Sequence, residues 1–318
     1  MRAATREWFA ARSHVHTDFD AVGLAERLAR RGERVSVVIP ARNEAATVGD
    51  VVAVLHRELV EAVPLVHELV VIDSDSTDDT AEVAASAGAT VHRCASIAPH
   101  MGSHPGKGEA LWKSLFVTTG DHLVFVDADL TSWGPHFVTG LVGALTADPA
   151  TLLVKGWYDR VLDVDGQEPS VEGGRVTELV ARPLLDLWWP ELAGVVQPLA
   201  GEWAARRALM ESLTVPTGYG VEIASLIDTH QRHGLQAIAQ VDLGARAHRH
   251  QKDHDLAVMA AELLAVVDAR RAGEPEEIRV AADELQQFTR DAGWRTRPVP
   301  LAQRPPARDQ AGYPGGDR

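Results

Sequence analysis

The sequence predicts an α/β fold built on a doubly wound parallel sheet. Through the first 130 residues, short β-branched runs alternate with helical segments, and polar residues follow several of these runs. This alternation is typical of parallel strands joined by crossover helices. Ligands of such sheets bind beyond the carboxyl ends of the strands, so the polar loops at that edge are candidate sites.

Four strands are expected in the first half of the chain. The first, Val35–Ile39, is a β-branched run closed by Pro40, which suits a buried parallel strand. The other three are expected at 68–72, 90–93 and 122–126. Helices are expected between the strands at 45–59, at 80–87 with Gly88 as the C-terminal cap, and from Lys107 onward.

The second half is less regular. Strands are expected at 152–158, 161–164 and 237–243, and helices at 175–187, 221–233, 253–272 and 275–290. Residues 1–34 are charged and helical in character. From Arg295 the chain is rich in Pro, Arg and Gly, a composition that predicts a disordered tail.

Composition narrows the class of protein. The formal net charge of -14 over 318 residues argues against a nucleic-acid or anionic-membrane partner. The single cysteine, Cys94, rules out an internal disulfide and fits a reducing cytoplasm. No apolar run reaches the length of a membrane span, and the N-terminal segment lacks the apolar core of a secretory signal. We therefore expect a soluble cytoplasmic enzyme with no membrane span and no nucleic-acid partner.

The strongest local motif is Asp127-Ala128-Asp129, at the exit of an apolar strand. Two carboxylates one residue apart can approach one hard cation, and Mg²⁺ or Mn²⁺ prefers oxygen ligands that it shares with substrate phosphates. A solvated pair of Asp side chains in a turn explains the same motif. A third interpretation is a phosphatase, because four apolar residues followed by Asp-x-Asp-x-Thr match its pattern, with Asp127 as the nucleophile. That pattern normally closes the first strand of its domain, whereas here it follows the fourth.

The loop Asp73–Asp79 alternates oxygen ligands in the manner of a calcium loop. Its spacing excludes that site, because the sixth position is Asp78 instead of Gly and the twelfth is Ala84 instead of Glu. A loop between a strand and a helix, with an N-cap near Thr77, is the plainer account. Ser74 in this loop is a candidate to hold a base or ribose at the sheet edge.

Two glycine-rich segments open helices and are candidate anion sites. Gly173-Gly174-Arg175-Val176-Thr177 offers free N–H groups, the positive end of a helix dipole, a guanidinium and a hydroxyl. Gly106-Lys107-Gly108 has the same form. Ordinary turns before helices share this composition, so these segments alone do not decide the ligand.

Several segments together resemble a known family. The chain is similar in order and spacing to the glycosyltransferase A fold in VSVVIPARNEAATVGDVV, VVIDSDSTDDTAEVA and FVDADL. It resembles the glucosyl-3-phosphoglycerate synthases of actinobacteria, and their mannosyl-3-phosphoglycerate relatives, in HPGKGEALWKSL, VEGGRVTELVARPLL, GYGVEIASLID and AHRHQ. The resemblance spans about residues 34–250 and implies a nucleotide-binding half-sheet with an Asp-x-Asp metal motif.

The resemblance implies a donor site for UDP-glucose. The residues that match the family's donor contacts are Pro40, Ala41, Arg42, Asn43, Glu44, Ser74, Lys107, Asp127, Ala128, Tyr219, Gly220, Val221 and Glu222. Among them Glu222 would accept hydroxyls of the sugar, which makes it a catalytic candidate. A plain capping role also explains a carboxylate near a helix start.

The resemblance also implies a metal site and an acceptor site. Asp129 would bind Mg²⁺ or Mn²⁺, with His248 as the second protein ligand, and would count as catalytic together with Glu222. The 3-phosphoglycerate acceptor would be held by Gly174, Arg175, Val176, Thr177 and His250. His250 departs from the family, which commonly has Asn two residues after the metal His, so its role stays open.

The implied reaction is a retaining transfer of glucose from UDP-glucose to the 2-hydroxyl of 3-phosphoglycerate, carried out by a homodimer. The alternatives are a GDP- or UDP-mannose donor, an Asp-x-Asp phosphatase, and a non-catalytic nucleotide-sugar binder. The expected organisation is an N-terminal helical extension (1–34), a nucleotide-sugar-binding half (35–130), an acceptor-binding half (131–250), C-terminal helices (251–294) and a disordered tail (295–318).

Overall fold

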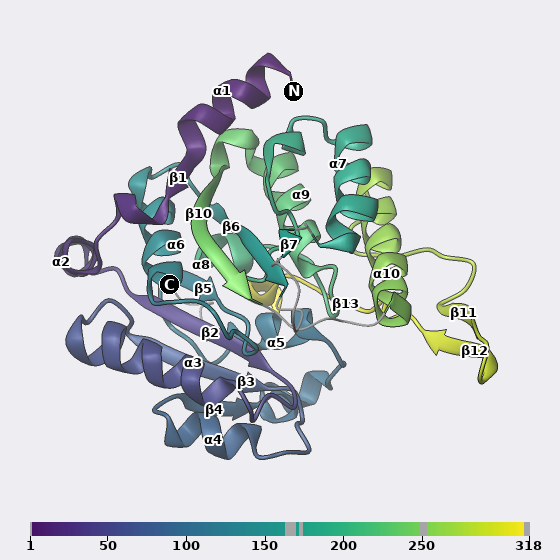
Figure 1. The fold of residues 1–318 in the computed structure, drawn as a ribbon, viewed down its shortest axis with the longest axis horizontal. Helices are drawn as coiled ribbons and strands as arrows, with labels where there is room; N and C mark the ends of the chain where they lie inside the picture. Colours follow the sequence, from purple (N-terminus) through teal and green to yellow (C-terminus); the bar gives the residue numbers. More distant parts are fainter. Residues whose placement is uncertain (1, 163–169, 172–173, 248–252, 315–318) are drawn as a thin grey trace.

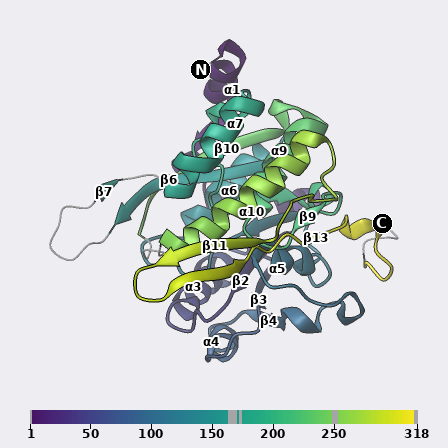
Figure 2. The same ribbon diagram turned by 90° about the vertical axis from the view of Figure 1, so that its right-hand side faces the viewer.

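A mixed β-sheet forms the centre of the computed structural model, which describes residues 2–162, 170–171, 174–247 and 253–314. The strand order is β1-β10-β6-β8-β5-β2-β3-β4, with β7 beside β6 (Figures 1 and 2). These strands are β1 Ser13–Val15, β2 Val35–Ala41, β3 Glu68–Asp73, β4 Thr90–Arg93, β5 His122–Phe125, β6 Leu153–Leu162, β7 Ser170–Val171, β8 Trp203–Arg206 and β10 Ile238–Ala247. Outside this sheet, two short pairs form from β9 Val215–Pro216 with β13 Gln303–Arg304, and from β11 Glu284–Thr289 with β12 Gly293–Pro298.

Helices cover both faces of the sheet. They are α1 Ala3–Arg12, α2 Ala21–Arg31, α3 Val48–Leu55, α4 Thr80–Ser86, α5 Lys107–Ser114, α6 His136–Ala147, α7 Arg182–Trp188, α8 Arg207–Met210, α9 Val221–His233 and α10 Asp253–Ala272. Helical turns at Thr177–Ala181 lead directly into α7. In the part of the chain that is described, no helix combines the length and the apolarity needed to cross a membrane.

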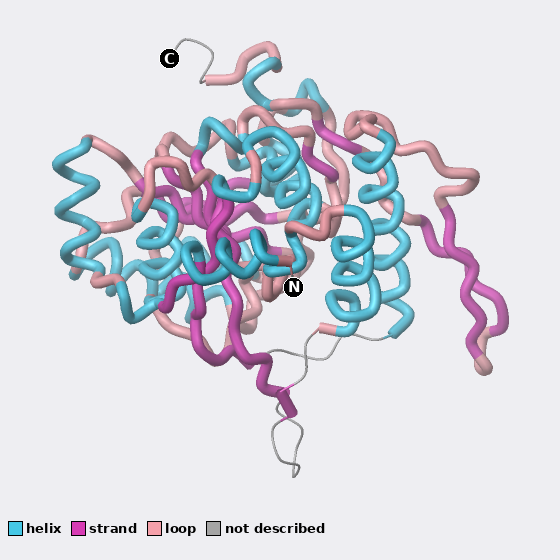
Figure 3. Tube along the Cα trace, turned by 90° about the horizontal axis from the view of Figure 1, so that it is seen from above, coloured by secondary structure: helices cyan, strands magenta, loops and turns pink. Residues whose placement is uncertain are grey.

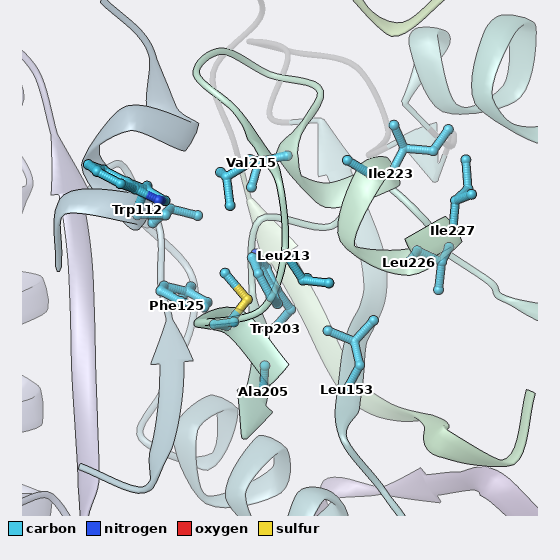
Figure 4. Packing of buried hydrophobic residues seen from close by; sticks show 14 of the residues in the cluster. Trp112, Phe125, Leu153, Trp203, Ala205, Leu213, Val215, Ile223, Leu226 and Ile227 are labelled. Atoms are coloured by element: carbon cyan, nitrogen blue, oxygen red, sulfur yellow. The ribbon is translucent and has the colours of Figure 1, made fainter. Parts of the chain in front are cut away.

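Alternation along β2 separates two hydrophobic cores. Val35 and Val37 belong to a buried cluster with residues of α2, α3, α4 and α6, whereas Val38 belongs to a cluster with residues of α1, α5, α7, α9 and α10. Successive side chains of a strand point to opposite faces, so one strand is buried by helices on both sides. Figure 4 shows part of the second cluster, in which the rings of Phe125 and Trp203 lie 4.3 Å apart between centroids.

The predicted doubly wound sheet is confirmed, with one antiparallel strand added at its centre. β1 to β6 and β10 run in one direction, while β8 is antiparallel to both of its neighbours, β5 and β6. β8 therefore begins at the edge where the parallel strands end. The short run that forms β8, WAAR, has too little β-branched character to be recognised as a strand from the sequence.

Two strands are longer than their sequence patterns predicted. β6 is continuous from Leu153 to Leu162, where separate strands were expected at 152–158 and 161–164. β10 was expected to end at Leu243 but continues to Ala247, because a bulge between Asp242 and Ala245 accommodates Gly244 within the strand. Residues 1–34 also contribute a strand, β1, in addition to the expected helices.

The expected helix at 275–290 is wrong. Residues 284–298 form an antiparallel hairpin, β11–β12, which projects from the body of the molecule (Figures 1 and 3). Gly293 has φ 68° at the turn, a conformation that glycine adopts without strain and that favours a hairpin. The β-formers Phe288, Trp294 and Thr296 then pair across the two strands more readily than they would continue a helix.

The expected disordered tail is also wrong for residues 295–314. β13 pairs with β9, and the Arg304 side chain is buried. Arg304 donates to both carboxylate oxygens of Glu109, from Nε at 2.7 Å and from a terminal nitrogen at 2.6 Å. A third nitrogen donates to the carbonyl oxygen of Met101 at 2.9 Å. A composition low in apolar residues predicts disorder, but it does not reveal that one arginine has a complementary buried carboxylate.

The buried Arg304–Glu109 pair gives a prediction for stability. Removing one partner of a buried pair costs about 3–5 kcal/mol when the other charge is left uncompensated. Without Arg304, Glu109 would keep Lys113 as an ion-pair partner, whose Nζ lies 3.5 Å from Glu109 Oε1. Arg304→Ala should therefore lower the free energy of unfolding in urea by up to about that amount. Arg308→Ala is the matched control, because the Arg308 side chain is 57% exposed, and it should change stability by less than about 0.5 kcal/mol. Equal stability of the two variants would mean that the C-terminal segment does not anchor the fold.

Candidate active site

Two polar loops are tied together where β2 and β3 end. Asn43, with φ 58°, accepts a hydrogen bond from the Thr77 N–H at 2.8 Å through Oδ1, and its own N–H donates to Ser76 Oγ at 2.9 Å. The Ser74 N–H donates to the carbonyl oxygen of Ala41 at 2.9 Å. The predicted nucleotide contacts from these loops therefore adjoin one another at the sheet edge; they are Pro40, Ala41, Arg42, Asn43, Glu44 and Ser74.

An ion cluster joins three further segments at the same edge. Lys107 is the first residue of α5, Asp127 follows β5, and Glu222 lies in the first turn of α9. The Lys107 Nζ lies 2.6 Å from Asp127 Oδ1 and 2.9 Å from Glu222 Oε1. The structure thus brings together three residues that the sequence analysis singled out separately.

Lys107 and Asp127 are both held in their charged forms. Burial alone would lower the pKa of Lys107, but Asp127 and Glu222 outweigh burial and raise this pKa well above its ordinary value. Burial would raise the pKa of Asp127, but Lys107 and Arg246 outweigh it and hold this pKa far below its ordinary value. Lys107 and Asp127 therefore keep their charges across the physiological pH range.

Arg246, near the end of β10, connects this cluster to the second aspartate of the motif. Its guanidinium contacts Asp129 Oδ1 at 3.0 Å and Asp127 Oδ2 at 3.4 Å. Its other terminal nitrogen contacts Glu202 Oε2 at 3.0 Å and donates to the Tyr158 hydroxyl at 2.7 Å. Arg246 is buried, so the positions of both aspartates are set by one cation that is itself fixed.

The two aspartates differ in their fitness as metal ligands. Asp127 has Lys107 on one oxygen and Arg246 on the other. Asp129 has Arg246 on one oxygen, and its side chain is 39% exposed at the sheet edge. A carboxylate with access to solvent suits Mg²⁺ or Mn²⁺, which bind through few protein oxygens and share substrate phosphates. Asp129 fits that role and Asp127 does not.

The second predicted metal ligand, His248, lies outside the described residues, as does the acceptor candidate His250. Among the residues that are described, no group of three or more His, Cys, Asp or Glu side chains is arranged to hold a metal ion. Asp129 alone therefore represents the predicted metal site in the described structure.

The predicted acceptor segment lies at the start of the helical turns before α7. Gly174 is half-buried and Arg175 is exposed, whereas Thr177 is buried. Val176 is only 8% exposed and packs in the hydrophobic core, so its side chain is structural and only its backbone could meet a ligand. These helical turns contact α10, which also packs on α9. The predicted acceptor segment and the predicted donor segment at the start of α9 thus pack against the same helix, α10.

Tyr219 stands out in the remaining donor segment because 43% of its surface is exposed while its neighbours are covered. Gly220, Val221 and Glu222 are buried at the start of α9. Ala128 is also buried, between the two aspartates of the motif, so its contribution to a ligand would come from its backbone.

Three buried charged residues of the site were missed by the sequence analysis. Arg246 lies beyond residue 243, where its strand was expected to end, and Glu202 precedes the unrecognised β8. Lys155 is buried in β6, where its ammonium group donates to the carbonyl oxygen of Ala200 at 2.8 Å, and burial lowers its pKa to about 7. A signal for Lys155 was available, because it is the one charged residue in the apolar run at 152–158, where a strand was expected.

Comparisons with known proteins agree with this arrangement. The sequence profile of glycosyl transferase family 2 matches residues 36–195. The chain is 47% identical over 281 residues to glucosyl-3-phosphoglycerate synthase of Mycolicibacterium smegmatis, and the aligned region covers 87% of this chain and 90% of the relative. It is 45% identical over 257 residues to the enzyme of the same name from Petrotoga mobilis, covering 80% of this chain and 79% of the relative.

Solved structures are similar over nearly the whole chain. Glucosyl-3-phosphoglycerate synthase of Mycobacterium tuberculosis, in complex with Mn²⁺, UDP-glucose and phosphoglyceric acid, matches with a TM-score of 0.79 at 44% identity, covering 90% of this chain and 94% of that one. The same enzyme with Mn²⁺, UDP and glucosyl-3-phosphoglycerate matches with a TM-score of 0.79 at 45% identity, covering 90% and 95%.

The sheet with its central antiparallel strand, the Asp-x-Asp motif at its edge and these similarities lead to one assignment. The chain has the glycosyltransferase A fold and belongs to glycosyl transferase family 2 and, within it, to the family of the glucosyl-3-phosphoglycerate synthases.

Proposed function

We propose that the protein transfers glucose from UDP-glucose to the 2-hydroxyl of 3-phosphoglycerate, with retention of the anomeric configuration. The observation that carries this proposal is the contact of Lys107 with both Asp127 and Glu222, because it joins the motif expected at the diphosphate to the residue expected at the sugar. Relatives with this name at 45% to 47% identity favour glucose over mannose as the transferred sugar.

The donor would lie across the carboxyl ends of β2, β3 and β5. The loop at 40–44 and Ser74 would hold the uridine, and Lys107 would meet the diphosphate from the start of α5. A lysine at a helix N-terminus suits a phosphate, because its charge adds to the positive end of the helix dipole. The N–H groups of Gly108 and Glu109 already donate to the carbonyl oxygens of Gly218 and Thr217, so the Lys107 side chain would supply the contact. Tyr219 and Glu222 would then line the sugar, on the side of the diphosphate where Lys107 already contacts Glu222.

A divalent cation, Mg²⁺ or Mn²⁺, would be held by Asp129 and His248. When bound, it would neutralise charge on the departing diphosphate. The tuberculosis enzyme was solved with Mn²⁺, which supports the same requirement here. Arg246 holds the Asp129 carboxylate in place through a contact of 3.0 Å.

The chemical step would be a front-face displacement. The bond between the anomeric carbon and the diphosphate oxygen breaks, and its electron pair leaves with UDP. The 2-hydroxyl oxygen of phosphoglycerate forms the new bond on the same face, and its proton passes to the departing phosphate oxygen. Glu222 would accept hydroxyls of the sugar and stabilise positive charge at the anomeric carbon, so its role is positioning and electrostatic.

The phosphatase interpretation needs Asp127 as a nucleophile. Asp127 instead bonds to Lys107 and Arg246, one cation on each oxygen, and neither oxygen is left to attack a phosphorus atom. This pairing supports a role for Asp127 in orienting Lys107.

The acceptor would be held by Gly174, Arg175, the backbone of Val176, Thr177 and His250. Arg175 is exposed and can meet a charged group of phosphoglycerate, while the buried Thr177 follows in the helical turns. The division into a nucleotide-sugar-binding half and an acceptor-binding half at about residue 130 is part of this proposal. A cytoplasmic location is also proposed, on the single buried cysteine.

We further propose a homodimer in which the β11–β12 hairpin contacts the second copy. An isolated two-stranded hairpin is marginally stable, yet this one projects from the body (Figures 1 and 3). Phe288 and Trp294 are 58% and 73% exposed and stack edge to face on one another, with centroids 5.5 Å apart. A second copy would cover these aromatic rings and stabilise the hairpin.

Metal dependence follows from the proposed role of Asp129. Asp129→Ala should lower product formation by at least about a hundredfold, because stabilisation of the leaving diphosphate is lost. The variant should stay folded, since Arg246 keeps its contacts with Asp127 and Glu202. Asp50→Ala, on an exposed position of α3, is the control. Full activity of the wild type in excess chelator would contradict the metal assignment.

Arg175 should affect the acceptor and not the donor. A charge-assisted hydrogen bond contributes about 1.5–3 kcal/mol, which corresponds to about ten- to a hundredfold in affinity. Arg175→Ala should raise the KM for 3-phosphoglycerate by that factor while UDP-glucose binding, measured without acceptor, changes little. Arg175→Lys should restore only part of the loss. Loss of UDP-glucose binding with an intact acceptor KM would instead place Arg175 in the donor site.

The hairpin aromatics should control the oligomeric state. The double variant Phe288→Ser with Trp294→Ser should elute as a monomer when measured by size exclusion with light scattering, while the wild type should be a dimer at micromolar concentration. Val22→Ser removes an apolar side chain of similar exposure from α2 and should leave the dimer intact. A monomeric wild type would reject the dimer, and a dimeric double variant would reject this interface.

A further inference from the structure

The turn Gly218–Gly220, which carries Tyr219, is enclosed on one side by the start of α5. The Gly108 N–H donates to the carbonyl oxygen of Gly218 at 3.0 Å. A Cβ at Gly108 would lie 1.9 Å from a carbonyl oxygen of β9, so only a glycine permits this approach. The turn therefore lies directly against the segment that presents Lys107.

The other side of the turn is enclosed by α10. The Gly220 N–H donates to Glu262 Oε1 at 2.9 Å. A Cβ at Gly218 would lie 2.3 Å from the same oxygen, and a Cβ at Gly220 would lie 2.8 Å from Val266 Cγ2. Both glycines thus lie in close contact with side chains of one helix, and the turn is packed between α5 and α10.

Glu262 is an unusual residue to find at such a contact. Its side chain is fully buried, and within the described structure its Oε2 has no hydrogen-bond partner. Burial raises the pKa of Glu262 to about 7, against the opposing effect of the Gly220 and Tyr219 N–H groups. A buried carboxylate with one unpaired oxygen is unfavourable for stability. The stability of the fold therefore does not explain a glutamate at this position. The hydrogen bond that its Oε1 accepts from the Gly220 N–H does.

We propose that Glu262 is a positioning residue for the donor sugar, which fixes the Gly218–Gly220 turn and thereby sets Tyr219 and Glu222 against Lys107. This inference rests on the proposed function, in which Tyr219 and Glu222 line the sugar. Glu262 touches no substrate and acts through the backbone of the turn. Its influence should therefore fall on the glucose part of the donor and leave the uridine part unchanged.

The test compares two ligands on the full-length protein. Calorimetric titrations with UDP and with UDP-glucose, in the presence of Mn²⁺, give the ratio of the two affinities. Glu262→Gln keeps the shape of the side chain but removes the negative charge that the Gly220 and Tyr219 N–H groups face. It should weaken UDP-glucose binding about tenfold and change UDP binding less than about twofold, because only the sugar contacts are misplaced.

A matched control separates positioning from folding. Val267→Ala, on the same helix and fully buried, should lower the melting temperature while leaving the ratio of affinities unchanged. Gly218→Ala places a methyl group against the Glu262 carboxylate and should reproduce the loss of UDP-glucose affinity. Combining it with Glu262→Gln should add little, because both substitutions disturb one contact.

Several results would overturn the role of Glu262. An unchanged ratio in Glu262→Gln, an equal loss for UDP and UDP-glucose, or fully additive effects of the two substitutions would each do so. Failure of the proposed function has a different signature, since the wild type would then form no product from UDP-glucose and 3-phosphoglycerate. Normal wild-type turnover with an unchanged ratio in the variant would reject only the positioning role.

Discussion

The candidate site depends on ion pairs in which positive and negative side chains alternate and several of the side chains are buried. Lys107 lies between Asp127 and Glu222, and Arg246 lies between Glu202 and the two aspartates of the motif. Without these cations the buried carboxylates would repel one another or take up protons. The arrangement also has a consequence for a diphosphate ligand. The cations of the cluster are already matched to carboxylates, so an added diphosphate would need a further positive charge, which is a physical reason for a divalent metal in the proposed reaction.

Local patterns predicted the regular part of the fold well. Strand β4 and the helices α9 and α10 match their expected bounds, and β3 is one residue longer than expected. Each is a clear periodic run closed by glycine, proline or polar residues. The errors arose where long-range pairing decided the structure. β8 is a strand because it pairs with both β5 and β6, and β13 is ordered because Arg304 forms an ion pair with Glu109. Neither reason can be read from the segment itself.

The candidate site was predictable to a different degree. Lys107, Asp127 and Glu222 were found because each lies in a segment with a recognisable pattern, and the structure brings them within contact distance. Arg246, Glu202 and Glu262 have no such pattern, since each is a single charged residue whose meaning comes from a partner far along the chain. Val176 differs again, because it lies within a recognisable motif while its side chain packs in the core, so its predicted contact with the acceptor stays a prediction for its backbone.

The C-terminal strand β13 has a consequence for how the molecule is made. Arg304 contacts Glu109 across 195 residues of sequence, and β13 pairs with β9 beside the Gly218–Gly220 turn. Contacts between residues so distant in sequence form late in folding, because the closure of a long loop must precede them. During synthesis the parallel sheet can assemble before β13 has emerged to pair with β9. A growing chain would thus hold Glu109 without its Arg304 partner until residue 304 is made.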